Sequence, residues 1–444
     1  MIRSVKLVFS TNVLFLGLSV VTSLLSAWAL GPDGRGELAI ITMWLFVFAL
    51  LGMLGLPQAH RYWNAKKPSW KSYILTNSLV FAAVASIFVI IAGWFAVPLI
   101  LAGKEPWLIY ATQLFLLNVP VLLLSELLRG QLEGAKLFGW LGSARITFIA
   151  IQAIAYLGFY FAGALDLAIA LYIIIAAQIS CVLVMLAGIL KVLRPRLRFS
   201  KAVFLKELNY GLRGYLGAIT EFAVWRLDQI MLTALASASV IGLYAIAVAI
   251  ADITATLASS VSDALLPEVA ASKNRRKASH LLARSLRLTL YAQIIALIPL
   301  WILAPWVLEF VFGSEFVAAA AVMRLLLVAS IFWSAGLIFI SGLNGIGKPG
   351  LTTMARIASA VTTVVTLLLL MPAYGITGAA VSSILGYAVL SGLAGYFFMK
   401  NSGVGFWEFI RPRANDISVS RFLAAVGLGR AFGGKLGFGP HPVD

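Results

Sequence analysis

Long apolar runs separated by short polar breaks fill most of this 444-residue sequence. A helix needs about 20 apolar residues to cross the hydrocarbon core of a bilayer. Many runs reach that length, and turn-forming residues such as Gly31-Pro32-Asp33-Gly34 separate them. The pattern predicts twelve membrane-spanning helices, near residues 8–30, 37–58, 74–100, 107–128, 138–162, 167–190, 209–236, 239–266, 288–312, 317–343, 351–371 and 375–399.

The composition agrees with a polytopic membrane protein. Apolar residues make up 61% of the chain and charged residues 11%, whereas soluble domains have about 45–50% and about 25%. The first apolar run, from Leu7 to Leu30, is longer than the core of a signal peptide, so we expect a retained helix although Ala27-Trp28-Ala29 imitates a cleavage site. The three histidines lie in polar segments, where we expect them to be solvated; they are His60, His280 and His441.

Basic residues alternate between two sets of connections. Most lysines and arginines lie at the termini or in connections that follow even-numbered runs, whereas the other connections hold only Arg35 and Lys104. Because lysine and arginine accumulate in cytoplasmic loops, we expect both termini in the cytoplasm and the chain in the cell (inner) membrane. The same rule explains the net charge of +17, so we expect contact with anionic membrane lipids and no nucleic-acid partner.

Two loops suggest an internal repeat. Gly130 to Lys136 follows the fourth run and Gly342 to Lys348 follows the tenth, each with a glycine and then a lysine six positions later. Two parallel halves would explain this similarity; chance resemblance of glycine-rich loops is the alternative. The predicted organisation is an N-terminal six-helix bundle at 1–190, a basic cytoplasmic linker at 191–207, a C-terminal six-helix bundle at 208–400 and a polar cytoplasmic tail at 401–444.

Ionisable residues inside the apolar runs are the candidate functional residues. Each costs at least about 2.5 kcal/mol at membrane depth, so such residues pair with one another or line a wet cavity. Arg226 and Asp228 stand in the middle of the run from Tyr210 to Leu235. Three positive and three negative residues lie deepest in the predicted helices: Arg145, Glu221, Arg226, Asp228, Asp252 and Arg324.

Helical spacing suggests how these residues are arranged. The seventh and eighth runs form a hairpin that places Asp252 within one turn of Arg226, so an ion pair between them is expected. Glu221 and Asp228 are two helical turns apart and share a face, whereas Arg226 and Asp228 point about 200° apart.

The planar guanidinium matches the oxygens of a phosphate. Arg145, Arg226 and Arg324, with Trp225 beside them, are therefore the candidate substrate-binding residues. Glu221, Asp228 and Asp252 are candidates for charge pairing or proton coupling. The alternatives are permanent ion pairs that lock the helices together and aromatic residues that only anchor the protein at the membrane interface.

Several motifs follow one another in a recognisable order. They are Gly31 to Glu37, Arg226-Leu227-Asp228, Gly242-Leu243-Tyr244 with Pro267 beyond it, Phe312 to Phe316, Gly342 to Pro349, and Gly375 to Ala380. Over about residues 8–400 this order resembles the bacterial oligosaccharide (O-antigen-type) flippases of the polysaccharide biosynthesis and export family. That family is grouped with the MATE drug exporters and the lipid II flippases in the MOP superfamily.

The resemblance implies an all-α, MATE-like membrane fold of two pseudo-symmetric six-helix bundles. It also implies that an undecaprenyl-diphosphate-linked oligosaccharide moves from the cytoplasmic to the outer leaflet by alternating access, without a cofactor. The implied partners are this lipid-linked oligosaccharide, membrane lipids and other polysaccharide-assembly proteins. Lipid II flippases carry an arginine in the first helix, whereas this chain has none between Lys6 and Arg35, which disfavours that assignment.

Other functions are weighed by what the sequence lacks. No nucleophile–base pair, phosphate-binding loop, dinucleotide fingerprint or metal-ligand spacing occurs, so we expect a protein that is not an enzyme. A membrane glycosyltransferase or polymerase would need a large loop outside the membrane, and the predicted outer loops are only a few residues long. The main alternative is a cation-coupled small-molecule exporter of the MATE type.

Overall fold

The computed structural model describes residues 2–272, 275–402, 405 and 407–410, and within these residues helices account for nearly all of the chain and no strand occurs. The α-helices are α1 (Ile2–Met53), α2 (Leu56–Lys66), α3 (Lys71–Ile100), α4 (Pro106–Phe115), α5 (Val119–Gly134), α6 (Phe138–Phe161), α7 (Leu167–Gly188), α8 (Lys201–Leu235), α9 (Ala238–Ala271), α10 (Arg275–Ile302), α11 (Ala304–Phe312), α12 (Ala320–Gly345), α13 (Pro349–Ser402) and α14 (Trp407–Ile410). Short 3-10 or π-helical segments adjoin several of them, among them η1 (Pro68–Trp70).

The helices are long and apolar, as the sequence predicts. Among the described residues, nine helical stretches are long and apolar enough to cross a membrane. Two of them merge two helices each, because α1 bends at Gly31 and α13 bends at Gly375. The charged and polar residues of the 35-residue α8 keep it outside these nine. The chain is therefore an all-α, multi-pass membrane protein, while the count of twelve crossings and the cytoplasmic termini stay predictions.

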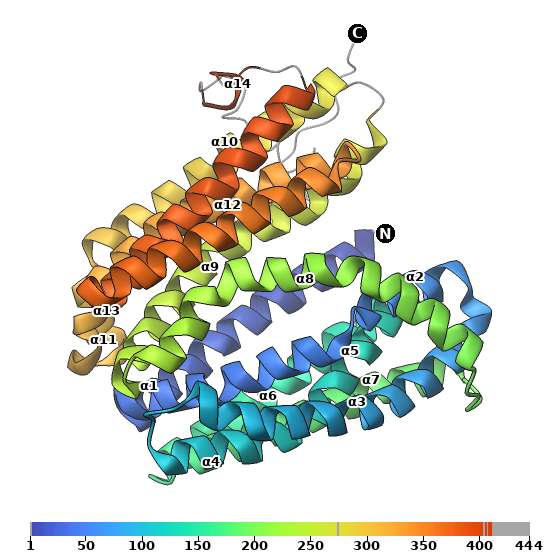
Figure 1. Ribbon diagram of the computed structural model, residues 1–444, viewed down its shortest axis with the longest axis horizontal. Coiled ribbons are helices and arrows are strands. Elements are labelled where there is room, and N and C mark those ends of the chain that lie inside the picture. The colour runs from blue at the N-terminus through green and yellow to red at the C-terminus, as the bar shows by residue number, and fades with distance from the viewer. Residues whose placement is uncertain (1, 273–274, 403–404, 406, 411–444) are drawn as a thin grey trace. The chain divides into compact units, whose positions relative to one another are not determined.

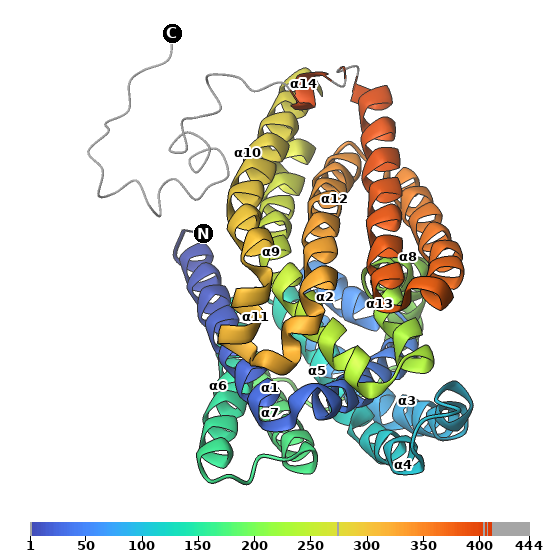
Figure 2. The ribbon, with the colours of Figure 1, turned by 90° about the vertical axis from the view of Figure 1, so that its left-hand side faces the viewer.

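Packing divides the described residues into two compact units. The first holds Arg3–Ile246 with Glu309–Phe316, and the second holds Ala247–Leu308 with the described residues from Val317 onward. In the first unit α2 and α3 both pack against α5 and α8, and Figure 1 shows α8 lying along this bundle. In the second unit α12 packs against α10 and α13 (Figure 2). These two units are defined by packing and not by the predicted sequence repeat. The predicted bundle boundaries at 190 and 208 therefore stay predictions.

Left-handed backbone positions recur at a nearly constant interval, which supports the predicted repeat. Three pairs of residues with positive φ stand 210, 211 and 212 positions apart: Gly103 with Gly313, Lys136 with Gly347, and Gly163 with Gly375. Each pair occupies corresponding connections in the two halves of the sequence.

The turns after α5 and α12 define the register of this repeat. The N–H of Leu137 donates to the carbonyl of Leu132, and the N–H of Lys348 donates to that of Leu343, each at 2.9 Å. Both bonds close a helix end around a left-handed residue. Lys136 therefore corresponds to Gly347 and not to Lys348, so the sequence comparison based on the two lysines is wrong by one residue.

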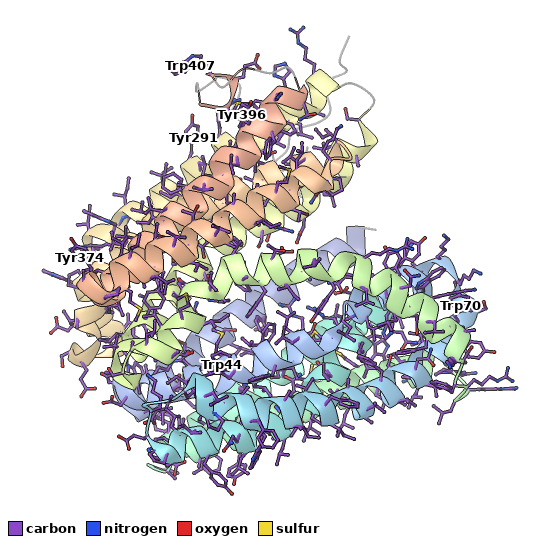
Figure 3. All side chains as sticks on the ribbon, viewed as in Figure 1. Trp44, Trp70, Tyr291, Tyr374, Tyr396 and Trp407 are labelled. Carbon is purple, nitrogen blue, oxygen red and sulfur yellow. The ribbon has the colours of Figure 1, made fainter. Side chains whose placement is uncertain are left out.

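The interior of the first unit is built from aliphatic and aromatic side chains. Cys181 is buried among leucine, valine and methionine side chains of α3, α5 and α7. Figure 3 shows Trp44 inside this unit and Trp70 at one end of it. Trp44 is buried and donates its ring N–H to the hydroxyl of Thr233 at 3.0 Å, which ties α1 to α8.

Candidate functional site

Four of the predicted site residues lie on α8, whose buried residues fall into two groups. The groups are Val203, Glu207 and Gly211 near the start of the helix, and Val224, Asp228, Leu232 and Thr233 near its end. None of residues 212–223 is buried. The middle of α8 therefore presents side chains to its surroundings, while both ends are held in packed structure.

Close backbone contact fixes the hairpin between α8 and α9. A Cβ atom at Gly36 would lie 1.7 Å from the carbonyl oxygen of Ala238, and one at Gly242 would lie 1.9 Å from that of Pro32. Real carbon atoms do not approach so closely, so both positions require glycine. These two glycines thus hold the beginning of α9 against the bend of α1.

Asp228 is a buried residue of this hairpin. Its side chain is 4% exposed and accepts hydrogen bonds from the Tyr244 hydroxyl and, at 2.7 Å, from the N–H of Gln229. A neighbouring cavity of about 10 Å³, lined in part by Gln229, Thr233 and Tyr244, has room for about one water molecule. This geometry favours the reading that Asp228 stabilises the hairpin.

Trp225 and Arg226 are adjacent on α8 and contact each other. The Arg226 side chain is half-buried, and its Cζ lies 4.0 Å from the centre of the Trp225 ring. Trp225 is 39% exposed and Glu221 is exposed as well. A guanidinium over a ring directs its N–H groups outward in its own plane. Glu221 and Asp228 share a helical face, as expected, but differ in burial.

Arg324, near the start of α12, contacts the end of α10. Its Nε donates to the carbonyl of Trp301 at 2.9 Å, and its Cζ is 5.2 Å from the centre of the Trp301 ring. Since α10 ends at Ile302, this contact caps carbonyls that the helix leaves unsatisfied. Part of the hydrogen-bonding capacity of Arg324 is therefore used inside the second unit.

Arg145 and Asp252 are accessible. Arg145 is exposed on α6, and its Cζ lies 4.8 Å from the centre of the Phe15 ring of α1. Asp252 is half-buried on α9. The ion pair between Arg226 and Asp252 stays a prediction, as do the substrate-binding and coupling roles of the seven predicted site residues.

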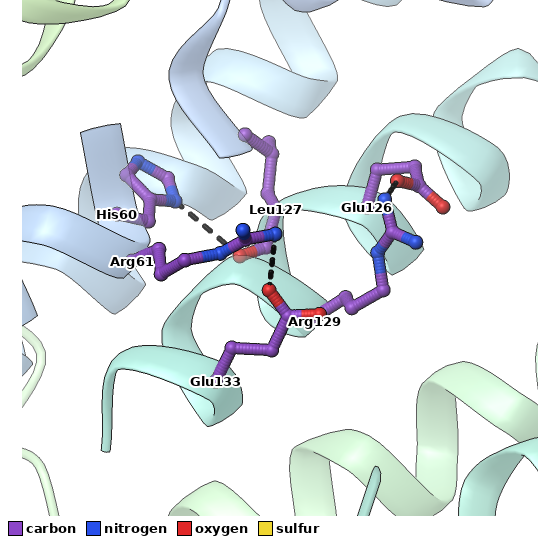
Figure 4. A network of polar contacts seen from close by, with 6 residues as sticks. All are labelled: His60, Arg61, Glu126, Leu127, Arg129 and Glu133. Carbon is purple, nitrogen blue, oxygen red and sulfur yellow. Dashed lines mark hydrogen bonds and ion pairs between the residues drawn. The ribbon is translucent and has the colours of Figure 1, made fainter. Parts of the chain in front are cut away.

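The sequence analysis missed two ion pairs where α2 packs against α5 (Figure 4). Arg61 pairs with Glu133, and Arg129 pairs with Glu126 on the same helix. His60, which follows the predicted second span, is 1% exposed, and its Nδ1 lies 3.3 Å from the carbonyl oxygen of Leu127. Burial lowers the pKa of His60 to about 4, so the expectation that this histidine is solvated was wrong.

A buried acid, Glu207, lies at the start of α8 and was also missed. Its side chain is fully buried, and its Oε2 accepts a hydrogen bond from the Asn77 amide at 3.0 Å. Among the described atoms, its Oε1 has no hydrogen-bond partner. Burial raises the pKa of Glu207, which precedes the predicted seventh span, to about 7. The clue in the sequence was Asn77, an amide inside the predicted third span.

The basic linker that leads into α8 is fastened to α3. The N–H groups of Arg196 and Arg198 donate to the hydroxyls of Ser72 and Thr76 at 2.9 and 2.8 Å. The N–H of Ser200 donates to the Asn77 side chain at 3.4 Å. Alternate residues of an extended segment thus meet polar side chains on one face of a helix.

Comparison with solved structures defines the class of the fold. The structure is similar to the lipid II flippase MurJ in an inward closed conformation, with a TM-score of 0.74 and 14% identity over 97% of each chain. It is also similar to an inward-facing MATE multidrug resistance transporter, with a TM-score of 0.72 and 14% identity over 87% of this chain and 94% of that one. The fold is that of the MOP superfamily.

Comparison of sequences gives the family. The family of polysaccharide biosynthesis proteins matches residues 25–321, and the chain belongs to this family. It is 24% identical over 216 residues to the probable low-salt glycan biosynthesis flippase Agl15 of Haloferax volcanii, covering 48% of this chain and 45% of that protein. It is 25% identical over 214 residues to an uncharacterized membrane protein of Methanocaldococcus jannaschii, covering 46% and 42%.

The matched part of the chain spans less than half the length of these two curated relatives. The predicted polysaccharide biosynthesis family and MOP-type fold are confirmed. That this member is bacterial stays a prediction.

Proposed function

We propose that this protein is a flippase that moves an undecaprenyl-diphosphate-linked oligosaccharide from the cytoplasmic to the outer leaflet by alternating access. The family match over residues 25–321 carries the proposal. A fold similar to that of a lipid II flippase and a relative described as a probable glycan biosynthesis flippase support it. In this proposal the protein transports its substrate without changing it chemically, so it is not an enzyme.

Arg226 is the residue to which the proposal assigns the diphosphate. Arg226 is half-buried on α8, and its Cζ lies 4.0 Å from the centre of the Trp225 ring, which covers one face of the guanidinium. This contact orients the guanidinium, whose planar fork of N–H groups matches two phosphate oxygens. Arg145 is a second candidate for the same role because its side chain is exposed. Glu221 and Asp252 are the candidates for ion coupling.

A strain that lacks the gene provides the test. Arg226→Ala is expected to abolish export of the glycan although the protein still inserts, and Arg226→Lys is expected to export poorly because a lysine cannot bind two oxygens side by side. Lipid-linked glycan on each leaflet of membrane vesicles, together with surface polysaccharide, is the measurement.

Arg213→Ala is the matched control, because Arg213 is an exposed arginine of the same helix whose Nε donates to the Asn209 side chain at 3.0 Å. This variant should export normally. Unchanged surface polysaccharide in Arg226→Ala would remove Arg226 from the site.

Cation-coupled export of small molecules is the second candidate function. The likeness to an inward-facing MATE transporter favours it. Purified protein in vesicles would then expel cationic dyes when a sodium or proton gradient is imposed, and deletion of the gene would leave the surface polysaccharide unchanged. Trapping of lipid-linked glycan on the cytoplasmic leaflet of the deletion strain would decide for the flippase.

A further inference from the structure

Four aromatic rings and three lysines gather at one end of the first unit, where Figure 3 labels Trp70. This aromatic–lysine cluster consists of Tyr62, Trp63, Lys66, Lys67, Trp70, Lys206 and Tyr210. Tyr62 stacks on Tyr210 with ring centres 4.3 Å apart, and Trp63 stacks on Trp70 at 5.0 Å. The residues come from α2, η1 and α8, so three separate elements meet in one surface.

The three lysines of the cluster are exposed and lie over its rings. The Lys66 ammonium is 5.1 Å from the centre of Tyr62, and those of Lys67 and Lys206 are 4.7 and 5.6 Å from the centre of Trp70. The electron-rich face of a ring attracts an ammonium group. It does not cancel the positive charge, as a carboxylate would.

No carboxylate of the cluster's own segments offsets this charge. Residues 61–71 contain no aspartate or glutamate, and the carboxyl of Glu207, beside Lys206, is buried against Asn77. Lys67 and Lys206 share one ring, so their ammonium groups are no farther apart than the sum of their distances to it. Both ammonium groups can therefore act on one anion that binds at this ring.

Two arginines of the same unit, unlike the three lysines, have carboxylate partners. Arg61 and Arg129 are each paired with a glutamate, between α2 and α5 in the first case and within α5 in the second. Lys66, Lys67 and Lys206 have rings as their neighbours and an open side toward solvent. The cluster therefore has the features of a binding surface for an anion with several charges.

We propose that the aromatic–lysine cluster captures the diphosphate of the lipid-linked substrate on the side of the membrane that the basic loops assign to the cytoplasm. This inference rests on the proposed flippase function and adds an entry site outside the predicted membrane-embedded residues. A diphosphate carries at least two negative charges and suits three ammonium groups better than the roughly single charge of an ordinary acidic phospholipid. Tryptophan and tyrosine rings are stable at the depth of lipid headgroups, where such a diphosphate lies.

Binding to the full-length protein in lipid nanodiscs tests the inference. The probe is undecaprenyl diphosphate without sugar, in a bilayer of neutral phospholipid, followed by native mass spectrometry and by tryptophan fluorescence. The variant is Lys67→Gln with Lys206→Gln. The matched control is Lys191→Gln with Lys201→Gln, which removes the same charge from exposed lysines of the same unit. We expect affinity to fall roughly tenfold in the variant and less than about twofold in the control.

Other outcomes separate the sources of the phosphate. Equal losses in the variant and the control would show general attraction between charges and overturn the site. Equally tight binding of phosphatidylglycerol in place of the diphosphate lipid would identify an ordinary membrane-surface contact and overturn it as well. Undiminished binding of undecaprenyl diphosphate to the variant would have the same consequence.

Transport by the same proteins distinguishes this inference from the proposed function. If the wild-type protein moves the lipid-linked glycan and the Lys67/Lys206 variant moves it equally fast at limiting substrate, the capture role is wrong while the flippase function stands. If the wild-type protein binds the diphosphate through these lysines but moves no glycan, the site stands and the flippase function fails.

Discussion

The two ends of α8 each bury a carboxyl group, and they hold it in opposite ways. At the end of the helix, Asp228 accepts hydrogen bonds from the Tyr244 hydroxyl and from a backbone N–H. At the start of the helix, Glu207 has a single amide donor from Asn77, and its second oxygen has no partner among the described atoms. A buried carboxylate is stable only if donors compensate for its lost hydration.

The difference suggests separate roles for the two ends. The α8–α9 hairpin surrounds Asp228 with hydroxyl and N–H donors, which hold its side chain in place. Glu207 is poised to gain or lose a proton near neutral pH, because burial raises its pKa to about 7. Three substitutions test how the two ends of α8 are held.

The largest effect is expected where the start of α8 meets the break between α1 and α2. Gly55 has a φ of 72°, and a Cβ there would lie 2.2 Å from the carbonyl oxygen of Gly211. Gly55→Ala should lower the free energy of unfolding by about 3 kcal/mol or more, because two backbones must separate and a left-handed alanine is strained. Thermal unfolding in detergent measures the change.

Gly214→Ala is the matched control on α8, since nothing lies within 4 Å of a Cβ at that position. Alanine should raise stability there by about 0.5–1 kcal/mol, because it favours a helix over the unfolded chain. If both alanine variants unfold at the wild-type temperature, the start of α8 is not held against α2 as described.

The second effect depends on pH. An ordinary glutamate titrates near 4.5, whereas burial raises the pKa of Glu207 to about 7 in the folded protein. The folded state thus favours the protonated form, so the wild-type protein loses stability as the pH rises from about 4.5 through 7. Glu207→Gln carries no charge at any pH, and its advantage should grow over this range to about 3 kcal/mol.

Unfolding of both proteins from pH 4.5 to 8 provides the measurement. The buried His60, whose pKa is lowered to about 4, loses stability as the pH falls and so acts in the opposite direction. It is present in both proteins, and its contribution cancels in their difference. Parallel pH profiles for the two proteins would mean that Glu207 does not titrate near neutrality.

The smallest effect is expected at the other end of α8. Tyr244→Phe removes the hydroxyl that donates to Asp228 and should cost about 1–3 kcal/mol, because a buried carboxyl loses a donor. Unlike Glu207→Gln, this change should leave the pH dependence between 6 and 8 unaltered. Tyr396→Phe is the control, since Tyr396 is an exposed tyrosine with 52% of its surface accessible. Unfolding of Tyr244→Phe at the wild-type temperature would mean that this hydroxyl does not stabilise the hairpin.

The sequence predicted the fold well because long apolar runs have few solutions other than membrane helices. The breaks at Gly31 and Gly375 were predicted from their glycine and proline content, and both are bends in the structure. The register of the repeat was missed because lysine occupies the left-handed position at 136, where the other half has Gly347. The two lysines are therefore not equivalent positions. The residues that correspond in the two halves, Lys136 and Gly347, share a left-handed backbone conformation.

Sites were predicted less completely, because apolar periodicity shows which charges are deep but not what they contact. Arg226 beside Trp225 was identified from adjacency alone. The helix-capping contact of Arg324 with Trp301 could not be foreseen, because it depends on where α10 ends relative to α12. Glu207 was overlooked because it stands among the basic residues of a linker, where an acid is normally solvated.

The segment 194–200 that precedes α8 acts as a brace, because the backbone N–H groups of Arg196, Arg198 and Ser200 are hydrogen-bonded to α3. If the protein is expressed as two fragments, the first fragment should therefore end after Ser200, so that the whole segment 194–200 stays with α3. A break at Arg194 would place the N–H groups of Arg196 and Arg198 on the second fragment. The hydroxyls of Ser72 and Thr76 on the first fragment would then lose these donors within their own chain.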